Sequence, residues 1–124
     1  MSRAKPVMMI ALLLSAAGTG GCGTRRPPEA VARELVETAE ELAGVFESAR
    51  TIEDLRAQED RLRRIVRRAP QLRTEARRAG EIPSEVRGTY QARWDKAVRR
   101  IIAARAAWIR AGKSDMLEFV DELK

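Results

Sequence analysis

Histidine is absent from this 124-residue chain, and cysteine occurs once, at Cys22. Without imidazole the chain has no histidine base and no histidine metal ligand. A single cysteine excludes a disulfide within the chain. Two Trp, two Phe and one Tyr leave little aromatic surface on which bases or rings could stack. We therefore expect no enzymatic activity, no catalytic residues, no metal site and no small-molecule substrate.

A run long enough to span a membrane is also lacking. The longest apolar stretch, taken generously from Val7 to Ala17, is eleven residues, whereas a spanning helix needs roughly 20. Arg3 and Lys5 precede this stretch, and small residues follow it as far as Cys22. A short positive segment, an apolar segment and small residues, in that order, are typical of an export signal.

The first 22 residues resemble the precursor of a bacterial lipoprotein. The resemblance rests on Gly21 directly before Cys22, on the small Gly20, and on the Leu-rich run upstream. It implies cleavage between Gly21 and Cys22, a diacylglycerol on the Cys22 sulfur, and a fatty acid such as palmitate on the new amino group. Thr19 departs from the pattern, which usually has an aliphatic residue there. The alternative is an ordinary signal peptide that leaves a free thiol in the exported chain.

The covalent lipid on Cys22 is the only prosthetic group that we expect. Several acyl chains hold a protein firmly in a bilayer, whereas one holds it marginally. In enteric-type bacteria an Asp after the Cys retains a lipoprotein in the inner membrane. Residue 23 is Gly, so the resemblance favours the periplasmic face of the outer membrane. We divide the chain into a signal peptide (1–21), a lipidated Cys with a linker (22–28) and a helical domain (29–124).

The domain is predicted to be all-α, because its apolar residues recur near the 3.6-residue period of a helix and nowhere alternate as in a strand. We expect an antiparallel helical hairpin within a three-helix bundle, followed by a short fourth helix. The hairpin is formed by the second and third helices, and the first packs across it. The four helices are expected at about 29–50, 51–79, 84–113 and 114–124.

Residues with a preference for helix ends mark these boundaries. Hydroxyl side chains can accept a hydrogen bond from the backbone of the first turn, and glycine readily takes the backbone conformation that ends a helix. The predicted N-caps are Thr51, Ser84 and Ser114, and the predicted helix ends are Gly80 and Gly112.

Two heptad stripes on the second and third helices predict their packing. Small residues at 69, 76 and 79 recur toward the end of the second helix, and Tyr90 and Trp94 begin the stripe of the third. We expect these large side chains to fill the space beside the small ones. Pro70 interrupts the stripe, and a mid-helix Pro costs about 3 kcal/mol. A kink or a break is therefore expected at Ala69–Pro70.

The charges are separated along the chain. Residues 29–50 carry six acids and two Arg, and 51–79 carry five acids and nine Arg. Residues 84–113 carry two acids and eight basic residues, and 114–124 carry four acids and one Lys. The leading interpretation is that acidic helices pair with basic ones inside the bundle. The alternative is a basic face toward anionic membrane or cell-wall groups, formed by Arg61, Arg64, Arg68, Arg93 and Arg100. Nucleic acid is not an expected partner of an exported chain.

The sequence thus predicts a lipid-anchored helical protein of the bacterial cell envelope with a structural or protein-interaction role. The alternative function is an accessory subunit, or a cell-wall or membrane-surface binder, that uses the arginine-rich face. Expected partners are the membrane, through the anchor, and an envelope protein or a second copy. A self-contained bundle should bury Trp94, Trp108 and Phe119, whereas a partner-binding one should expose an apolar patch. A homo-oligomer would place the apolar stripe of residues 29–50 between chains.

Overall fold

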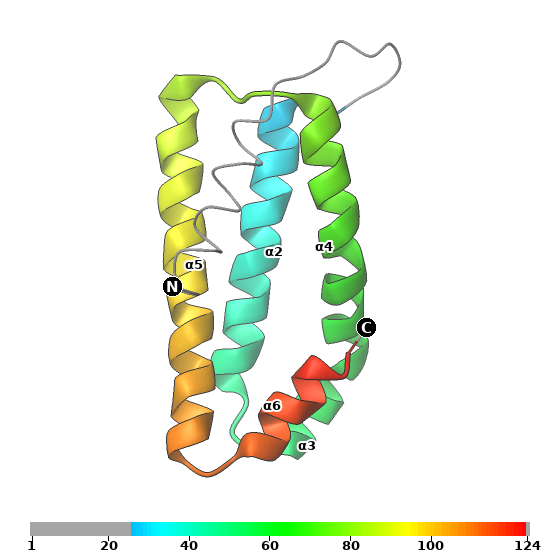
Figure 1. Ribbon diagram of the computed structural model, residues 1–124, viewed down its shortest axis with the longest axis vertical. Helices are drawn as coiled ribbons and strands as arrows, with labels where there is room; N and C mark the ends of the chain where they lie inside the picture. The colour runs from blue at the N-terminus through cyan, green and yellow to red at the C-terminus, as the bar shows by residue number, and fades with distance from the viewer. Residues whose placement is uncertain (1–25, 124) are drawn as a thin grey trace.

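The computed structural model describes residues 26–123, which form a helical bundle without strands (Figure 1). The predicted all-α fold is confirmed. The lipoprotein signal and Lys124 lie outside the described residues. The helices are α2 (Pro28–Ser48), α3 (Ile52–Ala57), α4 (Glu59–Ala79), α5 (Ser84–Arg110) and α6 (Ser114–Asp121).

Helix α2 lies between α4 and α5 and contacts both, whereas the backbones of α4 and α5 lie farther from each other (Figure 1). Helices α4 and α5 run antiparallel and are joined by the short segment 80–83, as expected for a hairpin. Helix α6 lies across the opposite end of the bundle, against α3 and α5. Within residues 26–123, no helix combines the length and the apolar character that crossing a membrane requires.

Three of the predicted helix boundaries are confirmed. The Thr51 hydroxyl accepts from the Asp54 backbone N–H at 3.3 Å, and the Asp54 carboxylate accepts from the Thr51 N–H at 3.1 Å. This reciprocal pair is a capping box, which satisfies two donors at the start of α3. Gly80 ends α4 with φ of 91°, and Gly112 follows α5 with φ of 71°. Both φ values lie in a region of backbone conformation that residues with a Cβ atom rarely adopt.

The predicted caps at Ser84 and Ser114 are wrong. Ser84 and Ser114 are the first helical residues of α5 and α6, and the cap positions belong to Pro83 and Lys113. Neither cap makes a side-chain hydrogen bond. The Pro83 carbonyl instead accepts from two backbone N–H groups of the first turn. Proline fixes its own φ, and Pro83 occupies the cap position, directly before the first helical residue of α5. Ser84 therefore lies inside the helix and not at its cap.

At Ala69–Pro70 a kink or a break is predicted. The break is wrong, because α4 continues through Pro70, whereas the kink stays a prediction. The interruption lies at Gln58, between α3 and α4, where φ is −104° and ψ is 13°. Pro70 is exposed, so its ring meets solvent on the outer side of α4, and its own φ suits a helix. Helix α3 contacts α6.

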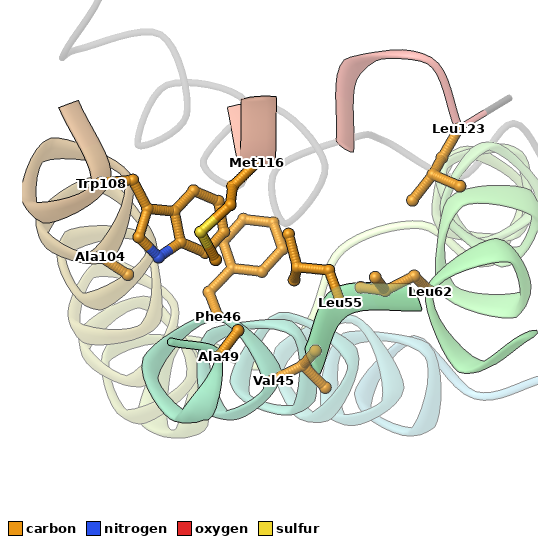
Figure 2. Packing of buried hydrophobic residues seen from close by; sticks show 9 residues of the cluster. All are labelled: Val45, Phe46, Ala49, Leu55, Leu62, Ala104, Trp108, Met116 and Leu123. Carbon is orange, nitrogen blue, oxygen red and sulfur yellow. The ribbon is translucent and has the colours of Figure 1, made fainter. Parts of the chain in front are cut away.

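The apolar core is divided into two clusters along the bundle. The turn-end cluster lies near segment 80–83 and joins α2, α4 and α5; its buried members are Val31, Ala32, Leu35, Val36, Leu72, Ala76, Ile82 and Tyr90. The α6-end cluster lies at the other end (Figure 2); its buried members are Val45, Phe46, Ala49, Leu55, Leu62, Ala104, Trp108, Met116 and Leu123.

Packing in the two clusters follows the predicted stripes. Tyr90 and Trp94 belong to the same turn-end cluster as Ala76 and Ala79. In the α6-end cluster the rings of Phe46 and Trp108 are tilted by 49° with centroids 5.0 Å apart (Figure 2). The apolar stripe of α2 is buried within the single chain, as packing across the hairpin requires.

Candidate functional site

The predicted processing site, Gly21 and Cys22, lies outside the described residues. The description begins at Arg26, whose guanidinium bonds Glu34 of α2 and, at 3.1 Å, Glu75 of α4. Because one arginine joins both helices, the start of the described chain is held against the end of the bundle where α2 begins and α4 ends. Three residues separate Arg26 from Cys22.

Ion pairs line the interface between α2 and α4. Arg68 binds Glu34 through two hydrogen bonds of 2.7 and 2.9 Å. Seven residues earlier on α4, Arg61 donates to Glu41 at 2.6 Å. The glutamates ascend by seven while the arginines descend by seven, which is the register of antiparallel helices. Arg68 also bonds Glu75 at 2.6 Å, so its guanidinium joins two carboxylates.

A second row of ion pairs lines the interface between α2 and α5. Arg93 binds Glu40 with hydrogen bonds of 3.1 and 2.7 Å, and Arg100 binds Glu47 with bonds of 2.9 and 2.6 Å. Both pairs are bidentate, the geometry in which a planar guanidinium fits a carboxylate best. Here both partners ascend by seven residues, which is the register of parallel helices. The two rows therefore hold α2 between its neighbours in one register.

These contacts shift the acid–base equilibria of the carboxylates. The Arg68 guanidinium, followed by that of Arg26, lowers the pKa of Glu34 from 4.5 to about 2, against the opposing effect of burial. Hydrogen bonding to Arg93 likewise lowers the pKa of Glu40, and hydrogen bonding to Arg68 lowers that of Glu75. All three carboxylates therefore favour the charged form, in which they bind the arginines.

The structure separates the five arginines of the proposed basic face into two groups. Arg61, Arg64 and Arg68 lie on α4, and Arg93 and Arg100 lie on α5, with α2 between the two helices (Figure 1). Four of the five are bound to glutamates of α2. The leading interpretation of the charge pattern, acidic helices paired with basic ones, is therefore confirmed. Arg64 has no ion-pair partner among residues 26–123.

An apolar groove lies between α4 and α5, with α2 as its floor and a volume of about 250 Å³. It falls between the two core clusters, where the three long helices do not close on one another. Ile102 on its edge is 43% exposed, and Trp94 in its wall is half-buried. Its other residues are Leu35, Thr38, Ala39, Leu42, Ile65, Ala69, Leu72, Val98 and Ile101.

The groove is the feature that the sequence reasoning missed. The heptad stripe of α5 includes Trp94 and Ile101 but leaves out Val98 and Ile102. With Val98 and Ile102 included, the apolar stripe of α5 is wider than one facing helix can cover. The neighbouring pair Ile101–Ile102 is the sequence signal that could have revealed the groove. Of the three side chains expected inside a self-contained bundle, only Trp108 is buried, whereas Trp94 and Phe119 are half-buried.

No group of His, Cys, Asp and Glu in the described part of the chain could hold a metal ion. Comparison with known protein families, with characterised proteins and with solved structures finds no match to this chain. The features of this chain that bear on function are the N-terminal sequence pattern, the ion pairs and the groove.

Proposed function

We propose that the protein is a lipid-anchored helical protein of the bacterial envelope with a structural or protein-interaction role and no catalytic activity. The carrying observation is Gly21–Cys22 at the end of a short positive and apolar segment that is too short to span a membrane. The lipid on Cys22 would be the anchor, with the periplasmic face of the outer membrane as its location.

The start of the bundle supports this proposal. From Cys22 to Pro28, where α2 begins, the chain has six residue steps, which span about 20 Å when extended. Arg26, within this stretch, is bound to Glu34 and Glu75. A domain tethered at Cys22 would therefore stay close to the membrane, with the start of α2 facing it.

The test is the mass and the membrane retention of the protein expressed in a bacterial host. We expect a chain that begins at Cys22 and carries the added mass of diacylglycerol and a fatty acid. Cys22→Ser should release the protein from membranes washed with high salt. The matched control is Thr19→Leu, which restores the usual aliphatic residue and should preserve processing. An unmodified mass of the 124-residue chain, or a Cys22→Ser variant that still floats with membranes, would refute the anchor.

The alternative is a surface binder for anionic membrane or cell-wall groups, and unpaired cations favour it. Several arginines have no ion-pair partner within residues 26–123, including Arg64, Arg67, Arg99 and Arg110. Each basic residue near an anionic surface contributes about 1 kcal/mol. In this case Arg64→Glu with Arg67→Glu should reduce co-sedimentation of the anchorless protein with phosphatidylglycerol vesicles. Equal co-sedimentation of the double variant and of the anchorless protein without these substitutions would exclude Arg64 and Arg67 as the binding surface.

A further inference from the structure

The three long helices occupy three of the four positions of a four-helix bundle. Helix α2 contacts both α4 and α5, whose backbones lie farther from each other, so the fourth position is the one opposite α2, between α4 and α5. Helix α6 fills only one end of that position. Its eight residues span about 12 Å, compared with about 40 Å for the 27 residues of α5. The apolar groove is the part of the fourth position that α6 leaves open.

Helix α6 indicates what kind of segment fits there. It is amphipathic and acidic, with Met116 buried in the α6-end cluster (Figure 2) and Asp115, Glu118 and Asp121 on its other faces. Asp121 accepts from Arg105 of α5 at 3.4 Å. Helix α2, which also packs between α4 and α5, is acidic and bound to both through its glutamates. Both helices that lie between the two basic helices are therefore acidic and amphipathic.

Two arginines of the complementary charge lie just past the α4 wall of the groove, toward segment 80–83. Arg73 and Arg77 follow the groove residue Ala69 by four and eight positions, so they continue its side of the helix. Neither has an ion-pair partner in the described part of the chain, unlike Arg61 and Arg68 on the opposite side of the stripe. The α5 edge carries Asp95 and Arg105, and Arg105 is already paired.

We propose that the groove binds a short acidic amphipathic helix of a partner protein, which completes the fourth helix position. Its apolar side chains would lie on Leu42, Ile65 and Ile102, and its carboxylates would meet Arg73 and Arg77. A second copy is a poor occupant, because the acidic helices α2 and α6 are already packed in their own bundle. The inference rests on the interaction part of the proposed function and does not depend on the lipid anchor.

The test uses the full-length protein, labelled with 5-fluorotryptophan, with phosphatidylcholine nanodiscs added to the solution. The chain has two Trp, and Trp94 lines the groove whereas Trp108 is buried in the α6-end cluster. The probe is a stapled peptide of about 16 residues, because shorter isolated helices are marginal. It carries Leu at positions i, i+3, i+4 and i+7 and Glu elsewhere. The matched peptide has Lys in place of each Glu.

We expect the Glu peptide to shift the ¹⁹F resonance of Trp94 and leave that of Trp108 in place. Ile102→Glu should weaken binding at least about 10-fold, since it places a charge against apolar and acidic groups. Ile102 is partly exposed, so the variant should fold. The matched control, Ile109→Glu, changes an Ile that is 63% exposed and outside the groove, and should bind normally. Arg73→Glu with Arg77→Glu should weaken binding about 10-fold and reduce its salt dependence.

Four results would overturn the inference. The first is failure of the Glu peptide to bind, and the second is equal binding of the Lys peptide or of Ile102→Glu. The third is a dimer that Ile102→Glu dissociates, because a second copy would then fill the groove. The fourth is a Trp94 shift caused by phosphatidylglycerol in the nanodisc and not by the peptide, because the occupant would then be lipid. None of these results bears on the mass of Cys22, so failure of the groove and failure of the anchor are distinguishable.

Discussion

Replacing Glu34 with Gln tests whether the ion pairs of α2 stabilise the bundle. The Glu34 carboxylate accepts two hydrogen bonds from Arg68 and one from Arg26. Its pKa is lowered from 4.5 to about 2, which corresponds to an upper limit of about 3 kcal/mol. The side chains of Glu34 and Arg68 are each 31% exposed, so solvent screening reduces this contribution to about 1–2 kcal/mol. Arg68 keeps Glu75 as a partner, which also limits the loss.

The assay is urea unfolding followed by far-UV circular dichroism at several pH values. Because the pKa of Glu34 is lower in the folded state, its stabilisation is complete above about pH 4.5 and is lost as the pH falls through about 2. At pH 7, Glu34→Gln should therefore lower the free energy of unfolding by about 1–2 kcal/mol. Each kcal/mol corresponds to a decrease in Tm of about 4–8 °C. The difference from wild type should disappear near pH 2.

The matched control is Glu37→Gln. Glu37 is an exposed residue of α2 that has no ion pair among residues 26–123. It should change the free energy of unfolding by less than about 0.5 kcal/mol. Equal stability of Glu34→Gln and wild type at pH 7 would refute the reasoning. A difference that stays constant from pH 7 to pH 2 would do the same, because it would come from packing and not from charge.

Three further substitutions probe packing, capping and backbone. Trp108→Ala should lower the free energy of unfolding by about 3–5 kcal/mol in urea titrations, since Trp108 is 5% exposed. Trp94→Ala should lower it clearly less, because Trp94 is half-buried. Equal losses for the two variants would contradict the position of Trp94 in the wall of an open groove. Thr51→Ala removes the capping box of α3 and should cost about 1 kcal/mol, with Thr51→Ser as the control that keeps the hydroxyl. Pro70→Ala should raise the Tm in a thermal scan, because Pro in a helix interior is about 3 kcal/mol worse than Ala and Pro70 is exposed; a lower Tm would show that α4 depends on the proline.

The helices and their charges could be predicted from local sequence patterns. A recurring apolar residue near every 3.6 positions identifies a helix wherever it packs, and Gly80 ends α4 because of its own backbone freedom. The capping box of Thr51 and Asp54 is equally local. The break at Gln58 is not local. Helix α3 contacts α6, which lies far along the chain, and spacing within one helix does not reveal a contact of that kind.

The candidate site divides in the same way. Arg61 and Arg68 lie on nearly the same side of α4, because seven residues complete almost two turns of a helix. Whether they face solvent or Glu34 and Glu41 depends on the position of α2, which neighbouring residues do not determine. The same holds for Arg93 and Arg100, which face α2 from the other side.

By itself the sequence determined the all-α class, the approximate helix limits, the division of charge between helices and the resemblance to a lipoprotein precursor. Each of these depends on residue types and on spacings within one segment. Only the tertiary structure decided that α2 lies between α4 and α5, that the ion pairs form two rows, and that a groove opens between α4 and α5. An apolar stripe indicates that one side of a helix must be buried. Which helix covers that side depends on how all the helices pack together. Ile102 remains partly exposed because none of the described helices packs over it.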